Sequence, residues 1–179
     1  MVWGAANPVG KPTEAETPLR SVQIDGQVVM KIVKHCTEHA PTLVTGQLLG
    51  LDIGATLEVT DCFPFPNQDA NATAAEGEED DGANYQLEMM RCLREINVDN
   101  NTVGWYQSTY LGSYYTEELI ETFLAYQENI KRCVCVVYDP TKSASVGTFG
   151  LKALRLTDRF LEIHRAGEFT FDKIADKSL

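Results

Sequence analysis

Long apolar runs are missing from this 179-residue sequence, because no uninterrupted apolar segment approaches the ~18 residues that indicate a membrane-spanning helix. The chain also lacks a basic start followed by an apolar run, so it shows neither a signal peptide nor a membrane span. Basic residues are scarce: 15 Lys and Arg stand against 26 Asp and Glu, which gives a formal net charge of −11. Phosphate binding needs a basic patch, and none is visible, so we expect no direct nucleic-acid binding.

A disulfide framework is also missing, although the sequence contains five cysteines. They are odd in number and scattered among apolar neighbours, which favours reduced thiols in a core. Reduced thiols predict an intracellular protein, and we expect it in the cytoplasm. Cys133 and Cys135 form a C-x-C pair on one face of an apolar strand, but no second pair exists to complete a zinc site.

Histidine occurs only three times, yet two of these residues fit a catalytic pattern. His35, Glu38 and His39 match the H-x-x-E-H signature of one class of zinc protease, in which two histidines on one helical face hold the metal. The alternative is that cationic side chains favour the C-terminal end of a helix through its dipole. We prefer this second interpretation because the pattern is short and His164 lies far along the chain.

The length suits one domain, and 44% hydrophobic residues are enough to build its core. Residues 1–17 are rich in Pro, Gly, Ala and Thr and lack periodic apolar positions, so we expect a flexible tail there. The domain is expected over residues 18–160, with a long acidic loop at 67–84 that carries most of the charge imbalance. Residues 161–179 are interpreted as the start of a C-terminal extension that is truncated.

Apolar periodicity, turn residues and capping residues predict strands and helices throughout the domain. The predicted strands cover residues 19–24, 43–51, 55–63, 102–107 and 132–138, with a strand pair or one long bent strand over 145–156. The predicted helices run from an N-cap at Asp25 to about His39, from 85 to about 96, and from 117 to about 129. The segment 139–142 is predicted to be a turn, and the chain from residue 158 looks helical at first.

The predicted helix from residue 85 to about 96 is apolar around much of its surface. Deep burial in its own core is one explanation, and a partner surface is the other, because Met side chains adapt well to irregular interfaces. Met89, Met90 and Leu93 are the candidate interface residues, since they are the apolar residues most in excess of what the helix needs for its own core.

The stretch from Thr102 to Thr116 is uncharged and has the composition of a strand up to about Gln107 and of a loop after it. Glu117 and Glu118 follow, where carboxylates favour the first turn of a helix. Polar side chains at the carboxyl end of a strand, just before a helix, commonly build a catalytic site. This stretch is therefore the first place to look for chemistry.

The order of the predicted elements resembles that of the MPN/JAMM fold family, and three stretches resemble its landmarks. They are Gly-Gln-Leu-Leu-Gly at 46–50, Val-Gly-Trp-Tyr at 103–106 and Val-Tyr-Asp-Pro-Thr at 137–141. The likeness covers roughly residues 19–157. It implies an α/β (α+β) fold, an MPN/JAMM domain in which helices flank a curved, mixed and mostly antiparallel sheet.

Active members of this family are zinc isopeptidases that cut ubiquitin-like modifiers, and they need H-x-H-P, S-x-x-D and a distant Glu. By this resemblance the two histidine positions match Gln107 and Thr109, and the proline position matches Tyr110. The general-base position matches Leu43, and a count without gaps places Ile120 at the aspartate. An amide or hydroxyl oxygen is a poor substitute for imidazole, and leucine cannot abstract a proton. The resemblance therefore implies a pseudoenzyme without metal, cofactor or catalytic residues.

A gapped loop would move Glu117 or Glu118 toward the aspartate position. One carboxylate alone does not hold a catalytic zinc ion, so this alternative leaves the interpretation unchanged.

Within the family, the chain resembles most a non-catalytic subunit of eukaryotic translation initiation factor three, through residues 85–91, 104–110 and 151–157. This resemblance implies a scaffold that helps to assemble the factor on the small ribosomal subunit. Its expected partners are the other subunits of the factor, especially an MPN partner, subunit f, and the ribosomal subunit through the complex. Neither a membrane nor sequence-specific nucleic acid is expected as a partner.

Other functions stay open at this point. One is a zinc-dependent isopeptidase or a metalloprotease that uses His35 and His39. Another is a module that binds ubiquitin or a peptide in the old substrate groove around Tyr110, Tyr114 and Tyr115. Exposed tyrosines would favour the binding module, whereas packing of these rings under the loop would argue against it.

Overall fold

The computed structural model describes residues 18–66, 78–95, 101–113, 116–147 and 149–166. The predicted tail over 1–17 and the chain beyond residue 166 lie outside these residues, as do Tyr114 and Tyr115. None of the helices described is long and apolar enough to cross a membrane.

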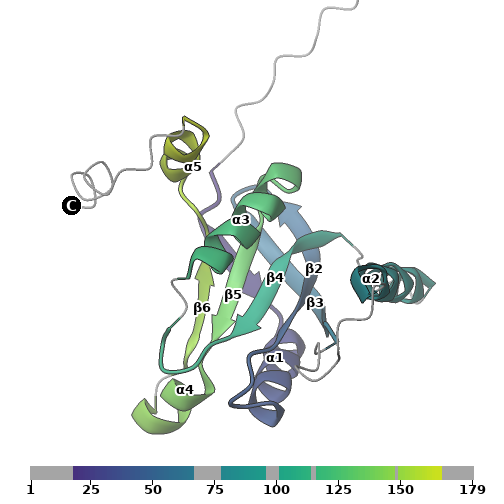
Figure 1. Ribbon diagram of the computed structural model, residues 1–179, viewed down its shortest axis with the longest axis vertical. Helices are drawn as coiled ribbons and strands as arrows, with labels where there is room; N and C mark the ends of the chain where they lie inside the picture. Colours follow the sequence, from purple (N-terminus) through teal and green to yellow (C-terminus); the bar gives the residue numbers. More distant parts are fainter. Residues whose placement is uncertain (1–17, 67–77, 96–100, 114–115, 148, 167–179) are drawn as a thin grey trace, which may run out of the picture.

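A six-stranded mixed sheet forms the centre of the described structure (Figure 1). Its strands are β1 (Ser21–Ile24), β2 (Thr45–Ile53), β3 (Thr56–Pro64), β4 (Thr102–Ser108), β5 (Val134–Tyr138) and β6 (Leu151–Leu154). Their order is β1-β3-β2-β4-β5-β6, in which β1 with β3 and β4 with β5 are parallel and the other neighbours are antiparallel. The predicted α+β fold with a mixed, mostly antiparallel sheet is confirmed.

Helices cover both faces of this sheet, with α1 on one face and α3 on the other (Figure 1). The helices are α1 (Gly26–Glu38), α2 (Glu78–Glu95), α3 (Glu117–Asn129), α4 (Pro140–Val146) and α5 (Asp158–Arg165). Helix α2 lies to one side of the sheet, next to the β2–β3 hairpin (Figure 1).

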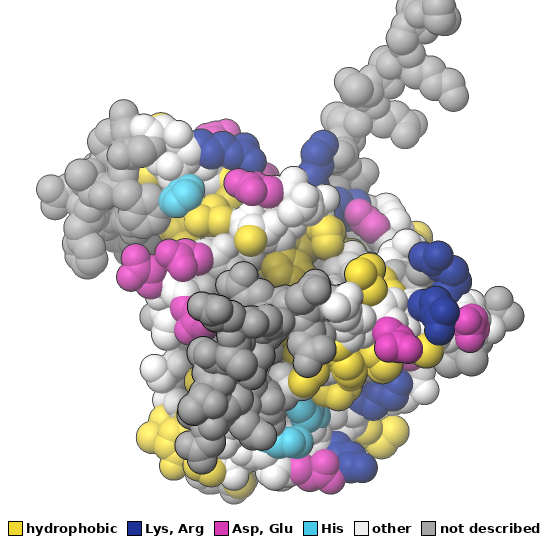
Figure 2. Space-filling model, turned by 45° about the vertical axis from the view of Figure 1, so that its right-hand side comes forward, with side chains coloured by type: hydrophobic (Ala, Val, Ile, Leu, Met, Phe, Trp, Pro, Cys, Tyr) yellow, Lys and Arg dark blue, Asp and Glu magenta, His cyan; other side chains and the backbone are white. Residues whose placement is uncertain are grey.

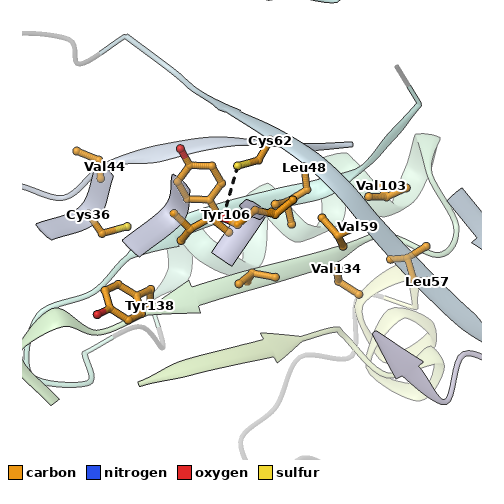
Figure 3. Packing of buried hydrophobic residues seen from close by; sticks show 13 residues of the cluster. Cys36, Val44, Leu48, Leu57, Val59, Cys62, Val103, Tyr106, Val134 and Tyr138 are labelled. Carbon is orange, nitrogen blue, oxygen red and sulfur yellow. Dashed lines mark hydrogen bonds between the residues drawn. The ribbon is translucent and has the colours of Figure 1, made fainter. Parts of the chain in front are cut away.

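Helix α1 packs on the sheet through Val28, Ile32 and Cys36, which recur every four residues and are fully buried. The Cys62 thiol donates a weak hydrogen bond to the Val28 carbonyl oxygen, with an Sγ to O distance of 3.9 Å (Figure 3). The other members of this core are Val44, Leu48, Leu57, Val59, Val103, Tyr106, Val134, Val136 and Tyr138.

Helix α3 packs on the opposite face through Leu119 and Phe123. The indole of Trp105 on β4 lies against the rings of Phe123 and Tyr126, with centroid distances of 4.6 and 4.5 Å. The C-x-C pair also belongs to this core, so the predicted placement of both thiols on one face is confirmed for Cys133 and Cys135.

Strand β4 needs glycine at position 104. Gly104 has a φ of 148°, which side-chain-bearing residues rarely adopt, and a Cβ there would lie 1.9 Å from the Val134 carbonyl oxygen on β5. The landmark at 103–106 therefore contains a residue that the close approach of two parallel strands requires.

The sequence pattern places the start of α2 too late. The helix begins at Glu78, so the predicted acidic loop over 67–84 is too long and its last residues are helical. The acidic residues of that run are compatible with a helix N-terminus because they meet the positive end of its dipole. Helix α5 crosses the predicted domain boundary between residues 160 and 161.

The chain after β5 also differs from the prediction. The predicted turn at 139–142 is the start of α4, where Asp139 Oδ1 accepts a hydrogen bond from the Lys142 N–H and Pro140 occupies the first turn. The strand predicted over 145–156 is reduced to β6, because α4 continues to its C-cap Gly147, which is left-handed.

Candidate functional site

Gln107 and Thr109, which the family resemblance matches to the two metal positions, lie at one end of the sheet, where β4 ends. Thr45 pairs with Gln107 across β2 and β4. Beyond this pair, the Val44 N–H donates to Ser108 Oγ and the Ser108 N–H donates to the Val44 carbonyl oxygen, each over 2.8 Å. Leu43 precedes Val44 and Thr109 follows Ser108, so these bonds bring together two segments that are distant in the sequence.

Gln107 and Thr109 lie on the α3 side of β4, as alternation from Trp105 requires. Gln107 is half-buried, and its Oε1 accepts a long hydrogen bond of 3.5 Å from Trp105 Nε1. Thr109 is only 4% exposed, and its N–H donates to the Tyr138 carbonyl oxygen over 2.9 Å. Its Oγ1 has no hydrogen-bond partner among the residues described. These side chains offer an amide and a hydroxyl where the family's chemistry needs two imidazoles.

The other two vacant positions offer no polar group at all. Leu43 is 63% exposed, and Ile120 is half-buried in the first turns of α3. Glu117 and Glu118 are exposed at the start of α3, whose N-cap is Thr116. Within the described part of the chain, no group of three or more His, Cys, Asp or Glu could hold a metal ion. The donor set therefore does not fit a catalytic zinc ion.

The two histidines of the protease-like pattern have structural partners. His35 Nδ1 and the Tyr106 hydroxyl share a hydrogen bond of 2.9 Å, and His39 Nδ1 donates to the His35 carbonyl oxygen over 2.9 Å. Burial lowers the pKa of His35, the nearby His39 lowers it further, and Glu38 opposes the shift. These contacts attach the end of α1 to β4 and favour a structural role for both histidines.

Four of the five cysteines are buried, and burial raises the thiol pKa of each: Cys36, Cys62, Cys133 and Cys135. Cys92 on α2 is exposed. A thiol with a raised pKa forms little thiolate near neutral pH, so burial favours a packing role for these cysteines.

A groove of about 400 Å³ lies between α1, the end of β3 and α2. Met89 and Leu93, two of the three candidate interface residues, line it, whereas Met90 does not, although it is also half-buried. The remaining lining residues are Lys31, Lys34, His35, Glu38, Asp61, Cys62, Phe63, Pro64 and Tyr106. Figure 2 shows the α2 side of the molecule, where apolar, basic and acidic side chains lie next to one another.

The charges around this groove are paired within the chain. Lys31 forms an ion pair with Asp61, which also accepts a hydrogen bond from the Cys62 N–H, and Lys34 lies 3.9 Å from Glu38. The charged rim is therefore largely neutralised before any partner arrives. The apolar side chains of the groove are therefore the surface that is available for contact with a partner.

Among the α2 side chains that the structure describes, Tyr85 and Gln86 form hydrogen bonds to the sheet. The Tyr85 hydroxyl donates to the Pro64 carbonyl oxygen over 3.1 Å, and its ring lies 6.5 Å from that of Phe63. Gln86 Nε2 donates to Gln47 Oε1 over 3.2 Å. Leu87 on the same helix is 69% exposed. The apolar surface of α2 is thus only partly used by its own domain.

The sequence pattern indicates neither the α1 wall of the groove nor the buried hydrogen bond between Gln47 and Gln86. In the sequence, the charged residues of α1 stand out only as part of the H-x-x-E-H pattern. Gln47 stands out only as part of the Gly-Gln-Leu-Leu-Gly landmark. A buried-strand pattern with one polar residue, as at Gln47 between Gly46 and Leu48, was the available signal, because a buried amide needs partners.

A model of the family described as JAB1/Mov34/MPN/PAD-1 ubiquitin protease matches residues 17–132. The chain is 64% identical over 170 residues to the H subunit of eukaryotic translation initiation factor 3 from Arabidopsis thaliana, covering 95% of this chain and 49% of that protein. The corresponding proteins of the same name from Dictyostelium discoideum and Nematostella vectensis are 51% identical over 166 residues and 47% identical over 156 residues. These alignments cover 92% and 86% of this chain, and 50% and 46% of the relatives. The chain thus spans about half the length of the curated relatives it matches.

Proposed function

The chain belongs to the JAB1/Mov34/MPN/PAD-1 family, and from this premise we propose that it is a non-catalytic scaffold subunit of eukaryotic translation initiation factor 3. In this role its MPN domain binds other subunits of the factor in the cytoplasm. It thereby supports formation of the initiation complex on the small ribosomal subunit. The names of the similar proteins in plants, amoebae and animals support the assignment to this factor.

The proposal that the subunit is non-catalytic rests on the side chains near the end of β4. By the family resemblance, Gln107 and Thr109 stand at the metal positions, and the alkyl side chains of Leu43 and Ile120 stand at the base and aspartate positions. Loss of a general base alone costs about 10²- to 10⁴-fold in rate, and loss of the metal removes the activated water as well. A domain with this set retains the fold without the reaction.

The α2 side of the domain supports the scaffold part. Met89 and Leu93 offer apolar surface inside a groove whose rim charges are already paired. An apolar centre with a polar rim is the usual anatomy of a protein interface. We assign this surface to another MPN domain of the same factor, subunit f, as the resemblance implies.

Metal content tests the non-catalytic assignment. The full-length protein is loaded with zinc, desalted and assayed for zinc by elemental analysis and for cleavage of a ubiquitin isopeptide substrate. We expect substoichiometric zinc and no cleavage from folded protein. Stoichiometric zinc that is lost on His35→Ala or His39→Ala would instead establish the metalloprotease alternative. Zinc retained in those variants together with cleavage would establish the isopeptidase.

Partner binding tests the scaffold assignment. The double variant Met89→Ala with Leu93→Ala removes apolar surface from the groove without introducing charge. We expect it to weaken binding to subunit f by about tenfold or more, as loss of a central apolar contact does. Met30→Ala is the matched control, because Met30 is exposed on α1 and does not line the groove. Equal binding by the double variant and the control would contradict the assignment of α2 as the partner surface.

Binding of ubiquitin or a peptide at the old substrate groove is a second candidate function. It is favoured by the 49% exposure of Tyr110 and the 71% exposure of Leu111, which leave apolar surface beside the vacant positions. Titration of labelled full-length protein with ubiquitin tests it. Chemical-shift changes at both residues support the function, and an unchanged spectrum at saturating ubiquitin rules out ubiquitin as the ligand.

A further inference from the structure

Gln47 is a polar residue in a fully buried stretch of β2. Its side chain is 1% exposed, and its neighbours in the register are Phe63 on β3 and Trp105 on β4. A buried amide is costly unless its hydrogen-bonding groups are satisfied. Its place in the middle of the sheet therefore depends on specific partners.

Those partners come from three different elements. Gln47 Nε2 donates to Thr102 Oγ1 at the start of β4 over 2.7 Å. Gln47 Oε1 accepts from Tyr126 OH on α3 and from Gln86 Nε2 on α2, each over 3.2 Å. An amide oxygen has two lone pairs, so these two donors fill its capacity. One buried side chain thus connects α2 and α3 to the centre of the sheet.

The bond to Gln86 holds α2 next to the place where the Tyr85 hydroxyl donates to the Pro64 carbonyl oxygen, so α2 has two neighbouring attachments. Gln86, Met89 and Leu93 lie three and four residues apart, which places them on one face of the helix. Holding Gln86 against Gln47 therefore limits rotation of α2 about its own axis. That rotation decides whether Met89 and Leu93 face the groove.

We propose that Gln47 is a positioning residue for the partner surface. Through Gln86 it holds α2 at the angle that presents Met89 and Leu93 in the groove, where the MPN partner binds. The inference rests on the proposed function, because α2 matters for binding only if a partner uses it. It adds that the affinity of the interface depends on a buried amide that the partner itself does not touch.

The test compares two glutamine variants in the full-length protein. Gln86→Ala breaks the bond to Gln47 from the partly exposed side and leaves the sheet intact. Gln27→Ala is the matched control, because Gln27 Nε2 on α1 also donates to the sheet, at the Thr60 carbonyl oxygen over 3.3 Å. Gln47→Met is the direct variant, and Gln86→Ala keeps the test decisive if Gln47→Met does not fold.

Two readouts are measured for each variant. Amide hydrogen exchange in α2 of the free protein is expected to rise about 2- to 10-fold in Gln86→Ala and to stay unchanged in Gln27→Ala. The dissociation constant for subunit f is expected to rise by a similar factor, because a smaller fraction of the protein holds the binding-competent orientation. A merely structural hydrogen bond would lower overall stability without a selective change in α2.

The outcomes separate this inference from the proposed function. Unchanged exchange in α2 of Gln86→Ala would overturn the positioning role. Increased exchange with unchanged affinity for subunit f would also overturn it, provided that the Met89→Ala and Leu93→Ala double variant weakens binding. If that double variant binds normally, the partner surface lies elsewhere, and both the interface assignment and the role of Gln47 in it are wrong.

Discussion

The end of β4 and helix α2 are joined to the sheet in different ways. Thr109 and Ser108 at the end of β4 are buried and bonded to the segments on both sides, at Tyr138 and Val44. Helix α2 carries the candidate partner surface, yet it joins the sheet through the side chains of Tyr85 and Gln86. The end of β4, where the resemblance implies vacant catalytic positions, is thus bonded to the segments on both sides, whereas α2, which carries the proposed partner surface, is bonded through side chains.

Truncation of one large side chain in each region should separate them most strongly. Trp105→Ala removes a ring packed on Phe123 and Tyr126 and is expected to lower the free energy of unfolding by about 3–5 kcal/mol. Leu87→Ala on α2 should change it by less than about 0.5 kcal/mol, because Leu87 is exposed. Urea denaturation measures both. Similar decreases in the free energy of unfolding of the two variants would contradict the expected difference between β4 and α2.

The exposed thiol on α2 should react much faster than the buried thiols of the core. Burial raises the pKa of Cys36 to about 12 and that of Cys133 to about 11, so little thiolate exists at pH 8, whereas Cys92 is exposed. Under native conditions, an aromatic disulfide reagent that releases a coloured thiolate should modify one thiol quickly. Cys92→Ser should abolish this fast phase. Several fast thiols in the folded protein would show that the core opens more readily than its packing implies.

Helix capping provides a smaller contrast. The Thr116 side chain accepts a hydrogen bond from the Leu119 N–H over 3.2 Å, so Thr116→Ala should lower the free energy of unfolding by about 1 kcal/mol. Asp25 is at the N-cap of α1 but its side chain makes no cap hydrogen bond. Asp25→Ala should therefore cost only a few tenths of a kcal/mol, from the helix dipole. Thermal melts of both variants test the order, and the reverse order would refute it.

The smallest expected effect is the pH dependence from His35 in the wall of the groove. Burial lowers its pKa in the folded protein below the ordinary value of 6.5, so the unfolded chain binds more protons between the two pKa values. The stability due to neutral His35 is fully present above pH 6.5 and is lost as the pH falls through the folded pKa. The free energy of unfolding should therefore decline less between pH 7 and 5 in His35→Gln than in wild type. Parallel pH profiles would contradict the burial of His35.

Local signals are sufficient for several elements. Helix α3 is predicted from residue 117 to about 129 and occupies Glu117–Asn129, because a capping threonine, two glutamates and an apolar periodicity act within one short segment. Helix α4 is not predicted because its seven residues, Pro140–Val146, are too few to show a period. Its cap, Asp139, predicts a turn equally well, since the same residue types start both structures.

The vacant positions are predicted only through the family resemblance, and the pairing of the segments around them is a property of the fold. Thr45 and Gln107 are far apart in the sequence and pair across β2 and β4, and Leu43 lies two residues before Thr45. For the candidate interface, the sequence indicates residues on one wall of the groove only. Met89 and Leu93 line a groove, but its other wall belongs to α1, which has no periodic relation to α2.

The sequence by itself determined the family resemblance, where α3 begins, and which thiols are surrounded by apolar neighbours. Each of these depends on residue identity or on hydrogen bonds within a few residues. Only the tertiary structure decided that Gln47 meets Gln86 and Tyr126, and that α1 and α2 enclose a groove. Such contacts join segments that are distant along the chain, so they exist only once the strands have paired and the helices have packed on them.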